Sequence, residues 1–531
     1  MGWLYGLMRG RSGFLVAVAM ILACASYKPA HTAVCDILGY GAIGDGVTVN
    51  TPAIQKAIDQ CAGKGDTVVV PAGNFLTGPV ELKSNLVFSI SKGGILLGLP
   101  MRSYYTGDSL SGGKTMALVN AYDQNDLTLE GGGTLDGNGG APDFLQGDNG
   151  AGRPRLLQMA RCRNVAVRNL NLRAPAFWTA YFQACVTVKI SGLHIDSHAN
   201  WNNDGLDIDS KDVLITDCVI HADDDALCLK NDFKDKPCEN VTVRRCVLSS
   251  SCNAIKLGTA SRGGFLNIDI AGVEIRTPAD YSVLRKRRTA LAGIAVENVD
   301  GGILDGIRIS DIRMEGIMTP IFIKLGDRQK PAGTLRNVAI SHIIAFPNSK
   351  ICSNITGLPG GPLMENITLS DILIHVPGGG SASDAAGTVP EVNDRCPEIL
   401  MYGRASLPAY GMFIRHAKNI SLRNVRYNLL LSDARPAQWF EDVPGLDTAG
   451  VSMGLKLPFK SHVRPAGPPR VFGSGLDPAS VDLRGRAIGA HGTAHYKKYL
   501  KESGGWLIEG PATRLEREAL NGRRMWQGNG D

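Results

Sequence analysis

Residues 164–172 read NVAVRNLNL, and variants of this phrase recur until about residue 427. Apolar residues alternate with polar ones in each copy, which predicts pairs of short, half-buried strands. Most copies begin with Asn, Asp or Gly, residues that are typical of turns. The further copies are VTVKISGLHI (186–195), DVLITDCVI (212–220), NVTVRRCVL (240–248), NIDIAGVEI (267–275), GIRISDIRM (306–314), NVAISHIIA (337–345), NITLSDILI (366–374) and NISLRNVRY (419–427).

The spacing of these copies predicts the fold. From Val165 the first apolar residues follow at steps of 21, 27, 28 and 27 residues, at Val186, Val213, Val241 and Ile268. A repeat of this length without helices between its strands indicates an all-β, right-handed parallel β-helix, a single-stranded solenoid, rather than a leucine-rich horseshoe. Asn suits the turn of each coil because it tolerates left-handed backbone angles and hydrogen-bonds its own backbone. Interruptions at 263–288, 347–361 and 378–395 are expected to be loops that wall a cleft.

A short helix is expected near the start of the solenoid. The segment TPAIQKAID at 51–59 has Thr at the cap, Pro in the first turn, and Ile54, Ala57 and Ile58 on one face. The first coil of a solenoid would otherwise expose a strand edge and an apolar face. We therefore expect this N-terminal helix to cap the stack.

Residues 1–25 have the pattern of a secretory signal peptide. Two arginines precede an apolar run at 14–22, and Ala23-Cys24-Ala25 offers a cleavage site. The same residues imperfectly resemble a lipoprotein box that would attach lipid to Cys24. We expect a secreted or periplasmic protein without a membrane span, because the run is too short to cross a bilayer. The expected division is a signal peptide at 1–25, a β-helix domain at 34–450 and a C-terminal tail of unknown role at 451–531.

The charge and cysteine content of the chain argue against nucleic acid and zinc as binding partners. The net charge of the 531-residue chain is only +6, with Lys and Arg scattered, so no basic footprint for nucleic acid is present. An exported protein permits disulfides, and Cys35 with Cys61 and Cys352 with Cys396 are candidate pairs. No Cys or His spacing is typical of a zinc site, and we expect neither a metal nor another cofactor.

Acidic residues are concentrated between Asn202 and Lys230. The stretches NNDGLDID at 202–209 and DDDALCLK at 223–230 contain three aspartates each. With Asp212 and Asp217 between them, the segment has eight carboxylates. Asp204 and Asp225 are 21 residues apart, which would place them on neighbouring coils about 4.8 Å apart. Like charges at that range raise the pKa of one carboxyl and leave another ionised, as acid and base catalysis requires.

These two motifs resemble the paired Asn-Thr-Asp and Asp-Asp motifs of glycoside hydrolase family 28, the polygalacturonases and their relatives. The resemblance implies that Asp224 is the general acid and that Asp204 and Asp225 hold the attacking water, with inversion at the anomeric carbon. Neighbouring coils place backbones closer than the roughly 6.5–9.5 Å between carboxyls of inverting enzymes, so inversion rests on the resemblance. Asn202 and the strand-end lysines Lys230 and Lys256 are candidate substrate ligands.

Two later family motifs are altered here. The Gly-His-Gly motif falls on CNAIKLGT, which puts Asn253 in the place of the histidine, and the Arg-Ile-Lys motif falls on GIAVENV, with Ala295 and Glu297 in the charged positions. Without that Arg/Lys pair, the site has less charge to match a galacturonate. The changes favour relatives that act on rhamnogalacturonan or other partly neutral chains.

Three further residues are candidate sugar ligands outside these motifs. Arg415 and His416 precede a repeat strand, and Arg328 ends the stretch IKLGDR. His416 could replace the missing histidine, although a lone histidine in a turn is more often an ordinary surface group, and Arg328 could equally form a loop salt bridge.

The sequence therefore predicts a monomeric, secreted hydrolase of pectic polysaccharide with α-linked uronic acid or rhamnose. Two alternatives remain open. A β-helix polysaccharide lyase would need an Arg or Lys base and calcium on the acidic cluster, and a non-catalytic β-helix would only bind carbohydrate.

Overall fold

The computed structural model describes residues 33–107, 115–145, 152–282, 285–361, 364–386, 388–395, 398–453 and 461–464. The expected signal peptide and Cys24 lie outside these residues, as does nearly all of the expected tail. Strands β31 and β32 extend the described coil to residue 464, past the expected boundary at 450.

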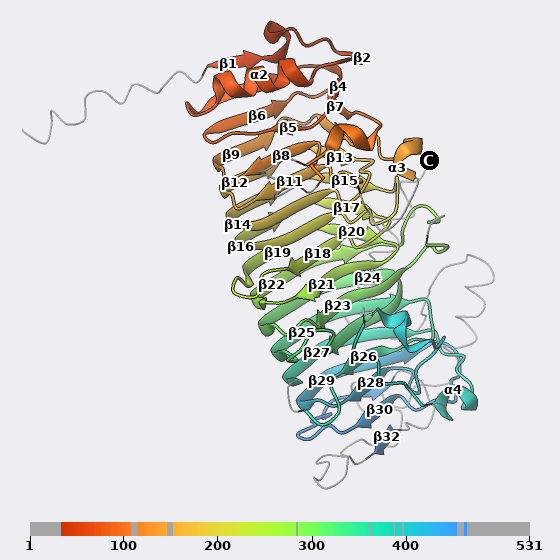
Figure 1. Ribbon diagram of the computed structural model, residues 1–531. Helices are drawn as coiled ribbons and strands as arrows, with labels where there is room; N and C mark the ends of the chain where they lie inside the picture. The colour runs from red at the N-terminus through yellow and green to blue at the C-terminus, as the bar shows by residue number, and fades with distance from the viewer. Residues whose placement is uncertain are drawn as a thin grey trace, which may run out of the picture.

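The chain winds into an elongated stack of parallel strands that form three sheets along its length (Figure 1), and the β-helix prediction is confirmed. Every pairing between named strands is parallel. Several long strands bend at a corner and so contribute to two or three sheets.

Sheet 1 runs along one face of the stack. It contains β5 (Val80–Glu81), β8 (Val119–Tyr122), β11 (Leu157–Ala160), the first parts of β14 (Ala180–Ser191) and β16 (Leu206–Thr216), β18 (Leu227–Asn231), β21 (Asn253–Ser261), β23 (Ala290–Asn298), the end of β24 (Ile303–Leu325), β26 (Ser353–Thr356), β28 (Met412–Arg415), β30 (Gln438–Glu441) and β32 (Ser461–Arg464).

Sheet 2 follows sheet 1 along each coil. It contains β1 (Val34–Asp36), β3 (Asp66–Val70), β6 (Leu86–Ile90), β9 (Asn125–Glu130), β12 (Arg163–Arg168), the second parts of β14 and β16, β19 (Cys238–Arg244), β22 (Gly264–Ile275), and the first parts of β24, β25 (Thr334–Pro347), β27 (Met364–Val376) and β29 (Lys418–Leu429).

Sheet 3 completes the coil. It contains β2 (Asp45–Val49), β4 (Gly73–Thr77), β7 (Gly94–Gly98), β10 (Thr134–Asp136), β13 (Asn171–Arg173), β15 (His194–Ser197), β17 (Val219–Ala222), β20 (Val247–Ser250), later parts of β22, β24, β25, β27 and β29, and β31 (Ser452–Met453).

Helical segments are short. The α-helices are α2 (Thr51–Cys61), α3 (Pro142–Leu145) and α4 (Ala382–Ala386), and the 3₁₀ turns are η1 (Ile37–Tyr40), η2 (Arg102–Tyr105) and η3 (Ile399–Tyr402). Helix α2 lies at the N-terminal end of the stack with Ile54, Ala57 and Ile58 buried, as the sequence predicted (Figure 1). Among the described residues, no helix combines the length and the apolar character that crossing a bilayer requires.

A ladder of turn residues at the start of sheet 2 holds successive coils in register. Its asparagines adopt left-handed φ angles of 53° to 59°, and their side chains bond along the ladder, as from Asn366 Nδ2 to Asn337 Oδ1 at 3.1 Å. The asparagines are Asn164, Asn240, Asn267, Asn337, Asn366 and Asn419. This confirms the turn role expected for the repeated Asn.

One predicted alignment is wrong by two residues. Val188, not Val186, pairs with both Val165 and Val213, and Thr187 occupies the Asn position of the ladder at φ 62°. The register shifts between Gln183 and Val186, so an irregularity in β14 moves the apolar alternation along the chain. Because Val186 and Val188 both fit a period of two, sequence alone could not choose between them.

Of the expected interruptions, strands shorten the first two, whereas the third is longer than predicted, since β27 ends at Val376 and β28 begins at Met412. Strand β22 continues to Ile275, so the first interruption begins only after that residue. Strand β26 lies within the second interruption, and helix α4 lies within the third.

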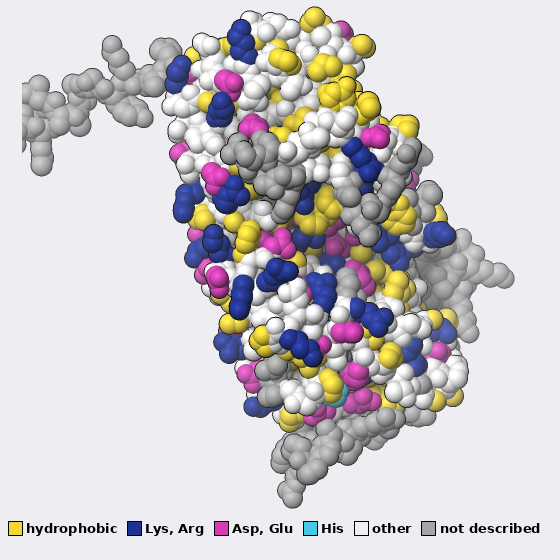
Figure 2. Space-filling view, viewed as in Figure 1, with side chains coloured by type: hydrophobic (Ala, Val, Ile, Leu, Met, Phe, Trp, Pro, Cys, Tyr) yellow, Lys and Arg dark blue, Asp and Glu magenta, His cyan; other side chains and the backbone are white. Residues whose placement is uncertain are grey.

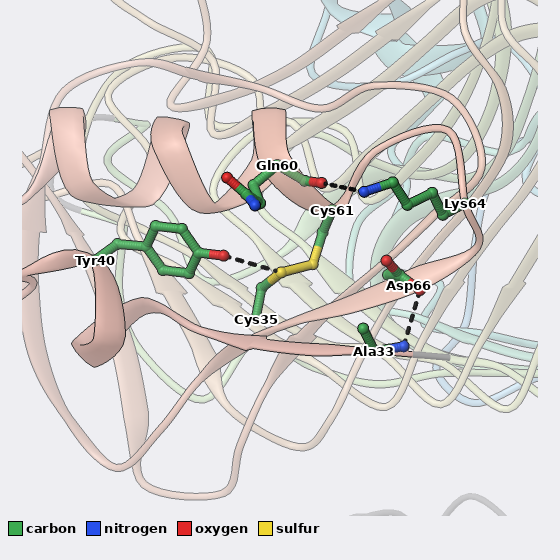
Figure 3. The surroundings of a disulfide bond; sticks show 7 residues. All are labelled: Ala33, Cys35, Tyr40, Gln60, Cys61, Lys64 and Asp66. Atoms are coloured by element: carbon green, nitrogen blue, oxygen red, sulfur yellow. Dashed lines mark hydrogen bonds between the residues drawn. A yellow bond between two sulfur atoms is a disulfide. The ribbon is translucent and has the colours of Figure 1, made fainter. Parts of the chain in front are cut away.

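A disulfide ties the capping helix to the first strand (Figure 3). Cys35 of β1 and Cys61 at the end of α2 are bonded across 26 residues, and the Tyr40 hydroxyl donates a hydrogen bond to Cys35 Sγ at 3.2 Å. The other suggested pair is not seen, because Cys352 is a buried free thiol and Cys396 lies outside the described residues.

The double replacement Cys35→Ser and Cys61→Ser should lower the free energy of unfolding by about 3 kcal/mol. Without the disulfide, the unfolded chain is no longer closed into a loop and gains conformational entropy. Guanidinium denaturation monitored by circular dichroism measures the difference. In the presence of a reductant the wild type should fall to the stability of the variant. Equal stability without reductant would contradict the prediction.

Candidate active site

Polar residues collect where the chain enters sheet 1 at the coils of β16, β18 and β21. The Gly205 amide donates to the Asp225 carbonyl at 2.8 Å, and the Ala226 amide donates to the Asn253 carbonyl at 2.9 Å. Asp204, Asp225 and Asn253 therefore lie on three successive coils, as the 21-residue spacing predicted for the two acids. Figure 2 shows acidic and basic side chains close together near the middle of this face.

Asp225 is held as a carboxylate. Its side chain accepts a hydrogen bond from Asn253 Nδ2 at 2.8 Å, and Lys256 Nζ lies 3.0 Å from its Oδ2. Burial alone would raise the pKa of Asp225, but the ammonium groups of Lys256 and Lys230 and the Asn253 hydrogen bond lower it to about 2. Asp225 is thus ionised over the whole physiological range.

Asp224, the next residue toward the N-terminus, has the opposite tendency. Burial, reinforced by the negative charges of Asp204 and Asp225, raises the pKa of Asp224 to about 7, although the guanidinium of Arg285 contacts its Oδ2. About 10% of the Asp224 side-chain surface is exposed to solvent. A carboxyl with this pKa carries a proton for part of the time at neutral pH and can donate it.

Asp204 shares a lysine with Asp207. Lys230 Nζ lies 3.1 Å from Asp204 Oδ2 and 3.2 Å from Asp207 Oδ1, and it stands 4.5 Å from the ring centre of Trp178. Burial raises the pKa of Asp204 to about 7 and that of Asp207 to about 6, against the opposing effect of Lys230. The Lys230 ammonium therefore balances the negative charge of Asp204 and Asp207, as Lys256 balances that of Asp225 on the next coil.

Asp209, a further acid of the segment 202–230, has a structural role. Its carboxyl accepts hydrogen bonds from Asn231 Nδ2 at 2.9 Å and from the Asp232 amide at 3.1 Å. It therefore fixes the turn that leaves β18, on the edge of sheet 1 opposite the acids.

Of the ten predicted site residues, the structure brings six into direct contact or onto adjacent coils, namely Asp204, Asp224, Asp225, Lys230, Asn253 and Lys256. Asn202 lies two residues before Asp204, and its side-chain oxygen accepts a hydrogen bond from Arg153 Nη2 at 3.0 Å. Asn202 thus orders the loop beside the acids.

The remaining three predicted ligands have other contacts. Arg328 pairs with Asp300 at 2.6 Å. Arg415 has 1% of its side-chain surface exposed and lies 2.6 Å from Glu391, and His416 lies between Glu391 and Asp442 at 3.2 and 3.0 Å. The structure does not bring these three residues to the acids.

Two charged residues of the site were missed by the sequence analysis. Glu398 accepts from Lys256 Nζ at 2.9 Å and from Asn253 Nδ2 at 3.2 Å, and Arg285 contacts Asp224. Both come from long connections that enter sheet 1, far from the acidic motifs in sequence. Arg285 lies in the loop expected at 263–288, whereas Glu398 lies three residues beyond the loop expected at 378–395, so only Arg285 had a signal in the sequence.

The described residues include one cluster with the donor atoms of a metal site. Oxygens of Asp224 and Asp225 and the sulfur of Cys252 lie within 4.8 Å of one another. Burial raises the pKa of the Cys252 thiol far above its usual range, which leaves it a poor ligand. A cation would also have to displace Arg285 from Asp224 and Lys256 from Asp225, so these residues do not fit a divalent ion well.

Comparison with known proteins gives a consistent picture. Residues 61–346 match the sequence model of the family "Glycosyl hydrolases family 28". A probable polygalacturonase of Vitis vinifera is 25% identical over 376 residues, which cover 65% of this chain and 75% of that protein. An exo-poly-α-D-galacturonosidase of Dickeya chrysanthemi is 25% identical over 321 residues, 49% of this chain and about half (53%) of that protein.

Solved structures agree on the fold. The exopolygalacturonase of Thermotoga maritima superposes with a TM-score of 0.57 at 20% identity, over 74% of this chain and 91% of that one. PfbA, a surface adhesin of Streptococcus pneumoniae, gives a TM-score of 0.50 at 14% identity, over 80% and 92%. At these identities the similarity is one of fold.

Removing the counter-charge of Asp225 tests the electrostatics of this site. Lys256→Met should lower the free energy of unfolding at pH 7 by about 3–5 kcal/mol, because Asp225 and Glu398 lose a buried partner. Lys211→Met is the matched control: its pair with Glu239 at 2.9 Å is exposed to solvent, so its loss should change the free energy of unfolding far less. Urea denaturation measures both, and equal effects would contradict this account.

Proposed function

Since the chain belongs to glycosyl hydrolase family 28 and is a glycosidase, we propose that it hydrolyses α-linked uronic acid or rhamnose linkages in a pectic polysaccharide. In this proposal Asp224 protonates the leaving oxygen. Asp225 and Asp204 hold and deprotonate the attacking water. No cofactor is needed for these steps, because water and carboxyl groups supply the acid and the base.

The observation that carries the proposal is the contrast between two neighbouring carboxyls. Asp224 has a pKa of about 7 and Asp225 a pKa of about 2, so at neutral pH one can donate a proton while the other accepts one. The difference follows from position, since Lys256 and Asn253 both contact Asp225, whereas Arg285 contacts Asp224. Pairs of carboxyls whose environments separate their pKa values are typical of glycosidases.

Positive charge beside the acids supports an anionic or partly anionic substrate. The family's Arg/Lys pair is replaced by Ala295 and Glu297, and both side chains are fully buried. Arg285 instead lies next to Asp224 with 23% of its side chain exposed, and it stands 5.8 Å from the ring centre of Trp201, which is 44% exposed. A guanidinium in this position suits a uronate carboxylate.

Inversion at the anomeric carbon is part of the proposal and has its own test. Oxygens of Asp224 and Asp225 lie within 4.8 Å, closer than the roughly 6.5–9.5 Å typical of inverting pairs. Asp204 on the neighbouring coil is a further carboxyl that can hold water. Proton NMR of the first product from an α-linked oligomer should show the β-anomer, and the α-anomer would contradict inversion.

Export is also proposed. The basic start and apolar run of residues 1–25 support a signal peptide, with lipid attachment at Cys24 as the alternative. The Cys35–Cys61 disulfide supports an oxidising compartment outside the cytoplasm. We propose that the protein acts there as a monomer.

Asp224→Asn should lower kcat/KM by at least about 100-fold, because the general acid is lost while the shape of the side chain is kept. Release of reducing ends from homogalacturonan, rhamnogalacturonan and their oligomers measures the activity. Asp217→Asn is the control, since Asp217 is half exposed, pairs with Arg245 and has a left-handed φ of 58° that Asn tolerates. Ultraviolet-absorbing unsaturated products, or unchanged activity of Asp224→Asn, would contradict the proposal.

The pH dependence should follow the charge beside Asp224. Catalysis requires the protonated acid, so kcat/KM should fall as pH rises through about 7. Arg285 lowers the pKa of Asp224, and Arg285→Gln should therefore move this alkaline limb upward by about one pH unit. Arg285→Lys, which keeps the charge, should leave the limb closer to that of the wild type. An unchanged or downward shift in Arg285→Gln would contradict the assignment.

A further inference from the structure

A segment between β27 and β28 lies across the outer face of sheet 1. We call its described parts, residues 388–395 and 398–402, the strap. Its residues contact the ends of β24, β26 and β28, which follow the acidic coils along the stack. The strap therefore covers sheet 1 on the C-terminal side of the acids (Figure 1).

Hydrogen bonds attach the first part of the strap to Lys324 and Arg415, which lie at the C-terminal ends of β24 and β28. Asn393 accepts a hydrogen bond from Lys324 Nζ at 2.6 Å through its side chain and another from the Asp327 amide at 2.7 Å through its backbone. Arg415 donates to the carbonyls of Val389 and Pro390 at 2.9 and 2.8 Å. Lys324 and Arg415 are both buried, so no saccharide reaches them while the strap is in place.

Apolar contacts hold the middle of the strap. Val389, Ile399 and Tyr402 pack against outward-facing residues of sheet 1 and form a core separate from that of the coil interior. The Tyr402 hydroxyl also lies 2.9 Å from Thr356 Oγ1 on β26. The sheet residues in this second core are Leu291, Ala292, Ala295, Phe322, Phe413 and Trp439. Such a layer makes the strap a fixed part of the fold.

The part of the strap that lies nearest to the acids is Glu398. Glu398, at the start of η3, bonds to Lys256 and Asn253, and these two residues are the direct partners of Asp225. The next coil, β23, is already covered, since Ala292 and Ala295 belong to the second core. On the opposite side of the acids, Trp178 is partly exposed, with Arg155 stacked 4.6 Å from its ring centre.

We propose that the strap blocks the outer face of sheet 1 immediately beyond Asp225, so that the enzyme acts on the ends of polysaccharide chains and not on internal linkages. The proposal rests on the proposed hydrolysis and specifies its substrate as a chain terminus. A polymer that lay along this face past Asp225 would have to occupy the space of Glu398 and η3. A terminal unit needs room on one side of the acids only.

The first experiment follows wild-type protein on a long pectic polymer. Reducing ends should accumulate while viscosity hardly changes, and the earliest products should be of a single small size. A rapid fall in viscosity with products of mixed length would overturn chain-end action. Absence of reducing ends from every pectic substrate would count against the proposed hydrolysis instead.

A binding measurement tests the closed cleft independently of turnover. The Asp224→Asn protein is titrated calorimetrically with pectic oligomers of increasing length. Chain-end binding predicts one protein per oligomer at every length. A number of bound proteins that grows with length would overturn the proposal, whether or not the wild type hydrolyses the oligomers.

Loosening the strap should change the mode of attack. Asn393→Ala combined with Tyr402→Ala removes the anchors on Lys324 and Thr356, and the loss of viscosity per reducing end should rise several-fold. Ser383→Ala, an exposed change in the same connection, is the control and should behave as the wild type. If the double variant is folded by circular dichroism and keeps the wild-type ratio, the strap does not determine chain-end action.

Discussion

The register of each coil on the next is the constraint on which this molecule depends. Parallel pairing repeats every position of the coil about 4.8 Å farther along the axis. Apolar residues therefore stack on apolar residues, and the turn asparagines stack on one another. The same rule places Asp204 beside Asp225, because Leu206 pairs with Leu227. A crowded group of buried acids is thus a direct product of the fold.

Such crowding is stable only with nearby positive charge. Lys230 lies on the strand that follows Asp225 and contacts Asp204, and Lys256 lies one coil farther, opposite Cys228, and contacts Asp225. Their unequal distribution separates the pKa values of Asp224 and Asp225, since Lys256 directly contacts only Asp225 of the two. The groups that stabilise the buried carboxylates are therefore the groups that give the two carboxyls different pKa values.

The sequence predicted those parts of the molecule that depend on local pattern. Alternating apolar residues and turn asparagines specify the coils, and a spacing of 21 residues specifies which acids meet. The prediction was wrong at Val186, because β14 is irregular and Val188, two residues later, pairs with Val165 and Val213. Glu398 and Arg285 were missed because their position depends on how long connections pack against the sheet, which no repeat encodes. For the same reason Arg415 looked accessible in sequence, although the strap buries it.

The strap also has a consequence for how such proteins diversify. It is inserted between β27 and β28, yet β26 pairs with β28 and β27 with β29 in the same manner as coils that have short connections. The pairing of the coils therefore does not depend on the length of this connection. Lengthening or shortening the connection would change what covers sheet 1 while the framework stays the same.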